Sequence, residues 1–233
     1  MHIIDFHSHI LPGIDDGSKD IEMSRQMLTA SHKQHIDTMV ATPHFYADRM
    51  SIDAFLHRRE YAYQSIIDDA DDEEIYLIKG AEVAFFSGMS HAERLEELRI
   101  GDTNLILIEM PFREWTDRDI KEIWQIRQRG LQPIMAHLER FYPYQKKNDM
   151  IESLLEQPVY VQINAESLFD FWGKRKALKL FKEGDAHLLG SDCHNTKDRI
   201  QNLAKAREVL AKKLGSGILH EIDGLGADLL TMD

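Results

Sequence analysis

The run Ile3-Ile4-Asp5-Phe6-His7-Ser8-His9 forms the first predicted strand and sets the pattern for the rest of the chain. Apolar residues lead into two histidines that one serine separates. On an extended strand, residues i and i+2 point to the same face, so His7 and His9 share a face and Ser8 lies opposite. Two imidazoles presented together can chelate a divalent cation. The run therefore predicts metal ligands at the C-terminal end of a strand.

Six further apolar runs of strand length follow, and amphipathic stretches separate them. The predicted strands are residues 3–9, 38–44, 75–83, 104–110, 132–138, 159–165 and 187–194. The predicted helices lie near residues 21–34, 54–69, 117–130, 150–156, 174–183 and 200–214, with a further short helix at 90–98 and a solvated acidic turn at 68–74. Strands that alternate with helices form βα units and a mainly parallel sheet. Seven such units without a Gly/Ser-rich linker predict one barrel-like α/β domain over residues 1–233.

Bulk properties narrow the class of protein. The 233 residues are 43% hydrophobic, and the net charge is −12 with histidine counted neutral. Such an acidic chain repels nucleic acid and anionic membranes. No apolar run approaches the ~18 residues that a membrane helix needs, and the N-terminus lacks the pattern of a signal peptide. A single cysteine excludes an internal disulfide. We therefore expect a cytoplasmic protein without membrane insertion.

Side chains that can bind metals recur where the predicted strands end. They are His7, His9, His44, Glu82, Glu109, His137, Asp192 and His194. In parallel α/β folds, ligand sites form at the C-terminal ends of the strands, so these residues should converge although they are scattered in sequence. Asp192 and His194 again share a face, with Cys193 opposite. A mixed imidazole and carboxylate set suits Mn²⁺, Fe²⁺ or Zn²⁺.

Short motifs around these residues follow one another in a recognisable order. They are His-Ser-His-Ile-Leu-Pro at 7–12, Asp-Asp-Gly at 15–17, Thr-Pro-His at 42–44, Gly-Ala-Glu at 80–82, Leu-Ile-Glu at 107–109, Ala-His-Leu-Glu-Arg at 136–140 and Ser-Asp-Cys-His-Asn at 191–195, followed by Arg199. In this order they resemble the PHP superfamily, named for polymerase and histidinol phosphatase domains. The closer resemblance is to its bacterial protein-tyrosine phosphatase branch, which is encoded with capsule and exopolysaccharide genes.

The resemblance implies a fold and a metal site. The fold would be a distorted (β/α)7 barrel of the PHP type, with three divalent ions at the C-terminal ends of the strands. Manganese is the usual metal of this branch, with iron or zinc as alternatives. The implied ligands are His7, His9, Glu82 and Asp192 for one ion; Glu82 as a bridge, Glu109 and His137 for the second; and Asp16, His44 and His194 for the third. Position in the motif alone favours Asp16 over Asp15, because alternation does not apply in a loop.

The resemblance also implies an activity. It is the metal-dependent hydrolysis of phosphotyrosine on a protein, by attack of a metal-bridging hydroxide. The expected partner is the tyrosine-rich tail of a bacterial tyrosine kinase that controls capsule or exopolysaccharide synthesis. Arg140 and Arg199 could hold the non-bridging phosphate oxygens as bidentate donors. The alternatives are a small-molecule phosphomonoesterase such as a histidinol phosphatase, a phosphodiesterase or nuclease that the acidic charge disfavours, and a non-catalytic binding module.

A second phosphatase signature must be weighed against the metal site. Cys193 and Arg199 have the Cys-x5-Arg spacing of thiol-dependent tyrosine phosphatases. Those enzymes need a loop of backbone N–H groups around the phosphate and a thiolate of low pKa. Here the loop contains no glycine, and Asp198 would bring a carboxylate next to the phosphate. We therefore expect Cys193 to be a buried apolar residue and the enzyme not to depend on cysteine.

Two groups of residues stay open at this stage. Phe45, Tyr46 and Arg49 follow His44 and are placed at the pocket mouth by adjacency alone. Gln162 and Asn164 end the sixth predicted strand, where a hydrogen-bonding role behind the ligands and a purely structural role are equally compatible with the sequence.

Overall fold

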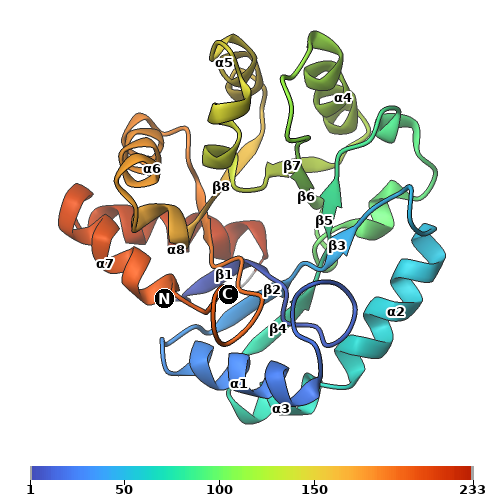
Figure 1. The fold of residues 1–233 in the computed structure, drawn as a ribbon, viewed down its shortest axis with the longest axis vertical. Helices are drawn as coiled ribbons and strands as arrows, with labels where there is room; N and C mark the ends of the chain where they lie inside the picture. The colour runs from blue at the N-terminus through green and yellow to red at the C-terminus, as the bar shows by residue number, and fades with distance from the viewer. Residues whose placement is uncertain (1, 232–233) are drawn as a thin grey trace.

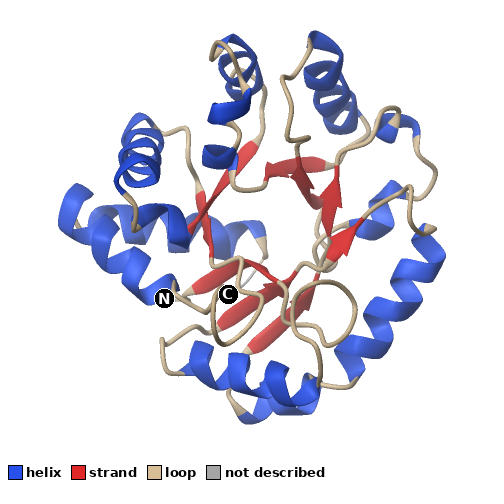
Figure 2. Ribbon diagram, in the orientation of Figure 1, coloured by secondary structure: helices blue, strands red, loops and turns tan. Residues whose placement is uncertain are grey.

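A computed structural model describes residues 2–231, with parallel strands at the centre and helices around them (Figures 1 and 2). The strands are β1 (Ile4–Ser8), β2 (Thr38–Ala41), β3 (His44–Phe45), β4 (Tyr76–Lys79), β5 (Glu82–Ala84), β6 (Leu105–Glu109), β7 (Gln132–Met135), β8 (Tyr160–Asn164) and β9 (Leu188–Gly190). The α-helices are α1 (Ile21–His32), α2 (Ile52–Gln64), α3 (Ile67–Asp72), α4 (Asp117–Gln128), α5 (Asp149–Leu155), α6 (Phe171–Glu183), α7 (Leu203–Leu214) and α8 (Gly217–Leu229). The predicted α/β alternation is confirmed.

The strands form a strongly curled parallel sheet in two parts. One part has the order β1-β2-β4, and the other has the order β3-β5-β6-β7-β8-β9. The segment after β9 returns to β1, where Ser8 and Cys193 form a parallel bridge. The backbone N–H of His9 donates to the carbonyl of Cys193 at 2.9 Å, and the N–H of Asp192 donates to the carbonyl of His7 at 2.8 Å. The ends of β1 and β9 are thereby held side by side.

Two of the predicted strands are each interrupted. The predicted strand 38–44 is β2 and β3, and the predicted strand 75–83 is β4 and β5. Pro43 lacks an N–H for a ladder, and Gly80 and Ala81 separate the other pair. The offset matters for the site, because β3 pairs with β5 so that His44 lies directly opposite Glu82.

Other predicted elements also differ in extent. The predicted helix 54–69 is two helices, α2 and α3, and the acidic run 68–74 is helical through Asp72 rather than a turn. The expected helix at 90–98 is two short 3-10 turns, η1 (Met89–His91) and η2 (Leu95–Leu98). The predicted strand 187–194 ends as a strand at Gly190. The sequence prediction missed α8, whose three glycines are poor helix formers.

An irregularity in β1 turns its end toward the centre of the sheet. The pairing with β2 changes from Asp5 opposite Met39 to Ser8 opposite Ala41, so β1 carries one extra residue. Before the extra residue, Phe6 belongs to an inner apolar cluster and Asp5 points to the opposite side. After it, His7 faces inward although it is an i+2 neighbour of Asp5. Bulges of this kind commonly re-aim side chains next to functional sites.

The inner cluster fills the end of the sheet opposite the metal-capable residues. Its members are Ile4, Phe6, Val40, Ile100, Leu105, Leu107, Ile134, Ala136, Leu188 and Leu230. Helix α8 packs against this cluster, and Gly226 allows the approach because a Cβ there would lie 2.8 Å from Cε2 of Phe6. Within residues 2–231, no helix combines the length and apolar character that crossing a lipid bilayer requires.

Gly190 provides a test of this close packing. A Cβ at this position would lie 2.6 Å from Cβ of His7 and 2.7 Å from Nε2 of Gln162. Gly190→Ala should therefore lower the free energy of unfolding by ~1–3 kcal/mol, the usual cost of overpacking. Gly224→Ala in α8 is the matched control, because nothing lies within 4 Å of its added Cβ. It should raise stability by about 0.5–1 kcal/mol through helix propensity. Urea unfolding measures both, and equal values for the two variants would contradict the packing argument.

Candidate metal centre

The structure brings together all nine side chains that the sequence nominated as metal ligands. His7 and Glu109 lie at the C-terminal ends of β1 and β6, His44 and Glu82 are the first residues of β3 and β5, and the others lie in the loops after β1, β7 and β9. The ligand atoms form three groups, and within each group they all lie within 4.8 Å of one another. The groups are His7, His9 and Glu82; His44, Glu82 and Glu109; and His9, Asp16, His44 and His194. Glu82, His9 and His44 each belong to two of these groups, so the three groups form one continuous cluster.

Hydrogen bonds fix how the imidazoles of His7 and His9 are presented. The N–H of His137 donates to Oε1 of Gln162 at 3.1 Å, which identifies that atom as an acceptor. Nδ1–H of His7 must then donate to it, at 3.0 Å. Nδ1–H of His9 donates to Asp15 at 2.7 Å. When the imidazoles are neutral, both Nε2 atoms carry lone pairs, and they lie 3.1 Å apart. Two lone pairs that face each other at this distance are favourable only with a cation or proton between them.

Glu82 is the carboxylate at the centre of the cluster. It is 1% exposed, and its Oε2 lies 3.4 Å from Nε2 of both His7 and His9 and 2.8 Å from Nδ1 of His44. Among the described residues, Oε2 of Glu82 and Nδ1 of His44 are buried polar atoms without a hydrogen bond. Burial would raise the pKa of Glu82, but His7, His137 and His44 hold it well below its ordinary value. Buried oxygen and nitrogen atoms that lack a hydrogen-bond partner are suited to bind divalent cations.

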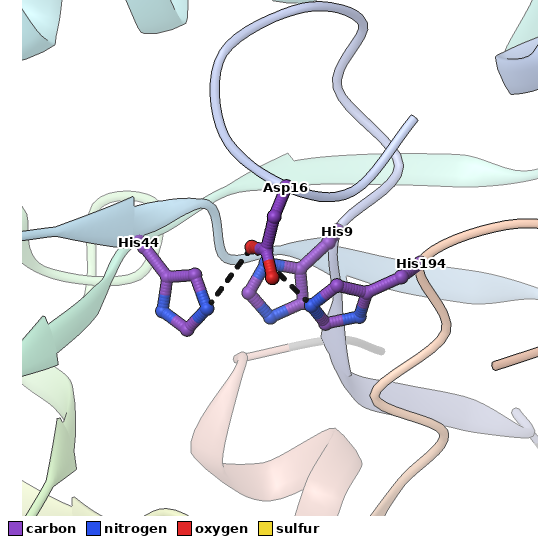
Figure 3. A group of neighbouring side chains, drawn as sticks. All are labelled: His9, Asp16, His44 and His194. Atoms are coloured by element: carbon purple, nitrogen blue, oxygen red, sulfur yellow. Dashed lines mark ion pairs between the residues drawn. The ribbon is translucent and has the colours of Figure 1, made fainter. Parts of the chain in front are cut away.

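The third group resolves the choice between two adjacent aspartates (Figure 3). Asp16 is 67% exposed, and its Oδ1 lies 3.3 Å from Nε2 of His44 and 3.6 Å from Nε2 of His194. Asp15 instead points behind the cluster, where it accepts the His9 imidazole and the backbone N–H groups of Gly17 and His44. Burial would raise the pKa of Asp15, but these hydrogen bonds hold it below its ordinary value. The geometry therefore places Asp16 with the ligands and Asp15 in support.

His137 reaches the cluster through an unusual backbone conformation. It follows β7 in the left-handed region with φ of 32°, ahead of the 3-10 turn η3 (Leu138–Arg140). Its Nε2 lies 2.8 Å from Oε1 of Glu82 and 3.4 Å from Oε1 of Glu109. Burial would lower the pKa of His137, but the hydrogen bonds to Glu109 and Glu82 raise it to about 10. A left-handed non-glycine residue is strained, and such strain concentrates at functional sites.

Asp192 connects the cluster to two arginines. Its Oδ1 lies 3.6 Å from Nε2 of His7 and 3.3 Å from Nε2 of His9. Its Oδ2 accepts from Asn164 at 2.7 Å and from Arg199 at 2.5 Å, and Arg140 approaches to 3.6 Å. Burial would raise the pKa of Asp192, but the neighbouring His7 and His9 hold it well below its ordinary value.

His194 is held in one tautomer. Its Nδ1–H donates to the carbonyl of Asp192 at 2.9 Å, and Nη1 of Arg199 donates to its Nε2 at 2.7 Å. Burial and the neighbouring His9 and Arg199 lower the pKa of His194 to about 4, so the imidazole is neutral at pH 7. Arg199 therefore contacts two predicted ligands at once, whereas Arg140 is 44% exposed and contacts only Asp192 of them.

Three supporting residues carry no ligand signal of their own in the sequence. Gln162 orients His7, and it also donates to Asn164 at 2.9 Å, so both amides have the hydrogen-bonding role that the sequence left open. Asp5 is fully buried and accepts from the N–H and hydroxyl of Ser191 at 2.7 and 2.6 Å and from Gln201 at 2.8 Å. Burial raises the pKa of Asp5. Only its place in a strand beside His7 could have suggested that it anchors the loop carrying Asp192.

Cys193 is placed away from the cluster. It is fully buried, and its Sγ lies 3.9 Å from Nε2 of Gln201, on the side that also holds Asp5. Burial raises the pKa of the Cys193 thiol. A buried thiol with a raised pKa lacks the thiolate that nucleophilic catalysis requires. The Cys-x5-Arg spacing is therefore incidental to the chemistry of this site.

Aromatic side chains lie on one side of the cluster, and a cavity lies on the other. The ring of Tyr46 lies 5.2 Å from that of His44 and the Arg49 guanidinium 4.1 Å above it, whereas Phe45 is buried in the core. On the other side, a cavity of about 930 Å³ includes Arg140, Asp192 and Arg199 in its lining. The placement of Tyr46 and Arg49 at the pocket mouth stays a prediction, and that of Phe45 was wrong because its side chain is buried in the core.

Comparisons with known proteins agree with this geometry. The sequence profile of the family described as "Capsular polysaccharide synthesis, CpsB/CapC" matches residues 3–226. The tyrosine-protein phosphatase YwqE of Bacillus subtilis is 29% identical over 92% of this chain and 86% of its own. The tyrosine-protein phosphatase CpsB of Streptococcus pneumoniae is 29% identical over 94% of each chain. A crystal structure from work on YwqE and CpsB, described as unique metal-dependent tyrosine phosphatases, has a TM-score of 0.85 and 27% identity over 99% of this chain and 96% of the other.

Proton release tests whether the cluster binds metal. In the metal-free chain, burial would lower the pKa values of His9, His44 and His137, but neighbouring carboxylates raise them, that of His137 to about 10, so a bound cation must displace protons. Calorimetric Mn²⁺ titrations in two buffers of different ionisation enthalpy should show release of more than one proton. Affinity should fall as the pH is lowered from about 8 to about 6. His57→Ala, an exposed histidine on α2, should change neither result. Binding without proton release would contradict the ligand assignment.

Proposed function

The chain belongs to the CpsB/CapC family of capsular polysaccharide synthesis, and on that basis we propose that it is a metal-dependent tyrosine-protein phosphatase. The relatives bearing that name cover nearly the whole chain, and the structure described as a metal-dependent tyrosine phosphatase shares its fold. The finer description of the fold is a single domain with a distorted (β/α)7 barrel of the PHP type. Each interrupted strand pair, β2 with β3 and β4 with β5, would count as one strand of that barrel.

One observation carries the proposal: a buried cluster of imidazole and carboxylate ligands lies directly beside two arginines. Glu82 stands at the centre of the cluster, and Arg140 and Arg199 contact Asp192 at its edge. A closed structural metal site has no need of guanidinium groups at its mouth. Guanidinium groups next to an open multi-metal site suit an oxyanion such as a phosphate monoester.

The cluster would hold three divalent cations, with manganese as the first choice and iron or zinc as alternatives. His7, His9, Glu82 and Asp192 would hold the first; Glu82, Glu109 and His137 the second; and Asp16, His44 and His194 the third. Such cations supply Lewis acidity toward phosphoryl oxygens and bring the pKa of a coordinated water toward about 7. Their six positive charges exceed the four carboxylates by about two. The site can therefore attract a phosphate dianion although the chain is acidic overall.

The protein's own groups position the phosphate and keep the site organised. Arg140 is the freer of the two arginines, and its planar guanidinium can donate to two non-bridging oxygens. Arg199 is already engaged by Asp192 and His194, so it holds those ligands while it presents its charge to the phosphate. Gln162 and Asp15 keep the Nε2 atoms of His7 and His9 directed into the cluster. The tyrosinate leaving group is stable enough that no strong general acid is needed.

The proposed substrate is phosphotyrosine within a protein, and the proposed partner is a cytoplasmic segment of a bacterial tyrosine kinase that controls capsule or exopolysaccharide synthesis. The name of the family links the chain to capsular polysaccharide. The cavity of about 930 Å³ beside the arginines supports a substrate that extends beyond the phosphorylated side chain. A small phosphomonoester such as histidinol phosphate is the alternative.

A substrate comparison tests the proposal. Rates on a phosphotyrosine peptide, histidinol phosphate and a phosphodiester should be measured with Mn²⁺-loaded and with chelator-treated protein. We expect kcat/KM to be highest on the phosphotyrosine peptide, chelation to abolish the activity, and Mn²⁺ to restore it, because the ligand set contains no thiolate. Faster turnover of histidinol phosphate would favour the alternative.

Cys193→Ser is the control for a thiol mechanism. It should change kcat by less than about tenfold, because a buried thiol that is not the nucleophile affects packing rather than the transition state. Full activity after verified metal removal, or loss of activity in Cys193→Ser with folding and metal content intact, would refute the metal mechanism.

The two arginines should differ when each is replaced by alanine. Arg140→Ala should lower kcat/KM on phosphotyrosine roughly 10²-fold, comparable to the loss of one charge-stabilising donor, and leave metal affinity unchanged. Arg199→Ala should lower kcat/KM as well, and should also weaken metal binding by about 10- to 100-fold, because Arg199 supports Asp192 and His194. Steady-state kinetics and metal titration give both values. An equal loss of metal affinity in the two variants would contradict the separate roles.

A further inference from the structure

The N-terminal turn of α6 presents two aromatic side chains to solvent. Phe171 is 72% exposed and Trp172 is 74% exposed, and their rings meet edge to face with centroids 5.2 Å apart. Asp170 caps the helix by accepting from the backbone N–H groups of Trp172 and Gly173, so this turn is a fixed part of the fold. Single exposed apolar residues are ordinary, but two adjacent large aromatics at the rim of a cavity mark an interaction surface.

Helix α6 is also strongly basic in an acidic protein. Its sequence contains Lys174, Arg175, Lys176, Lys179 and Lys182 against the single acid Glu183, whereas the whole chain has a net charge of −12. Across residues 2–231, the ion pair between Lys179 and Glu183, at 3.6 Å, is the only one that these five cations form. Lys176 lies 3.5 Å above the ring of Tyr142 instead of beside a carboxylate. A cationic surface with a single internal ion pair is complementary to an acidic ligand.

A groove joins this surface to the phosphate-binding arginines. It is the cavity of about 930 Å³, whose lining includes Tyr142, Trp172 and Lys176 as well as Arg140 and Arg199. This volume lies near the top of the ~300–1,000 Å³ range of ligand pockets, so a phosphorylated phenol at the inner end leaves the outer part free.

Two of the carboxylates that line the groove accept hydrogen bonds from backbone N–H groups and do not pair with Lys176. The Asp170 carboxylate caps α6, and Oε1 of Glu139 accepts the N–H of Asn164. Glu166 is the remaining carboxylate of the lining apart from Asp192, which the arginines already contact. Lys176 contacts the ring of Tyr142 and forms no ion pair with these carboxylates, so it is available to meet the carboxylates of a ligand.

We propose that this groove binds the polypeptide segment next to the phosphotyrosine and selects a segment that carries aromatic and acidic side chains. The proposal rests on the proposed phosphatase activity and adds a sequence preference to it. Trp172 packs against an apolar or aromatic side chain of the bound segment, and Lys176 pairs with its carboxylates. The direct continuity of the groove with Arg140 and Arg199 favours a peptide over an anionic membrane, which would meet the basic helix without entering the groove.

Matched peptides and variants test the preference. Two phosphotyrosine peptides of equal length, one flanked by Glu and Phe and the other by Lys and Ser, are compared with p-nitrophenyl phosphate, which does not reach the outer groove. The wild-type protein should prefer the acidic aromatic peptide by about tenfold in kcat/KM. Trp172→Ala and Lys176→Gln should each reduce that preference severalfold relative to p-nitrophenyl phosphate, as expected when an interface anchor is truncated. Trp124→Ala on α4, a tryptophan 45% exposed, is the matched control and should keep the preference.

Each contrary outcome has a distinct meaning. The proposed groove is refuted if the wild type does not distinguish the peptides, or if Trp172→Ala alters the rates on peptide and p-nitrophenyl phosphate alike. A change of oligomeric state in Trp172→Ala on size-exclusion chromatography would assign the surface to a second copy of the chain. Loss of binding to phosphatidylserine vesicles with unchanged peptide kinetics would assign it to a membrane, which also refutes the groove. A wild type that hydrolyses no phosphotyrosine substrate would overturn the proposed function itself.

Discussion

The buried carboxylate of Glu82 is the constraint around which the site is arranged. Removing a charged carboxylate from water is costly unless other groups compensate for it. The structure surrounds this carboxylate with the imidazoles of His7, His9, His44 and His137. That arrangement requires the interruption of the sheet at Pro43 and Gly80, because only the offset segments β3 and β5 place His44 directly opposite Glu82. The irregular sheet and the chemistry of the site therefore have a common cause.

Groups behind the ligands decide which atoms face the centre. Gln162 and Asp15 each accept an Nδ1–H, and so direct the lone pairs of two histidines to the same point. Asp5 holds Ser191, so the loop that carries Asp192 and His194 is anchored to β1 as well as to β9. Hydrogen bonds from behind are how proteins commonly fix the tautomer and orientation of metal-binding histidines. Replacement of a supporting residue would leave every ligand in the sequence and still disorganise the cluster.

The distribution of charge separates the active region from the rest of the surface. The chain is acidic overall, which discourages nucleic acid and anionic surfaces. Arginines nevertheless gather at the edge of the metal cluster, and basic residues continue along α6 at the far side of the groove. The two arginines and Lys176 of the basic helix therefore line the same cavity.

The sequence by itself determined the α/β class, eight of the nine clustered side chains and the seclusion of Cys193, because strand alternation and the shared C-terminal edge of parallel strands are local regularities. Only the tertiary structure decided that Asp16 faces His44 and His194 while Asp15 supports His9, since both lie in a loop whose course depends on distant partners. The extra residue in β1, which sends Asp5 outward and His7 inward, is likewise visible only in the pairing with β2. Helix α8 escaped prediction because its glycines oppose a helix locally, whereas its packing against Phe6 stabilises it in the fold. The periodic pattern of apolar residues is a local property of the sequence. Strand register, histidine tautomers and the close packing of α8 on β1 depend on contacts between residues far apart in sequence.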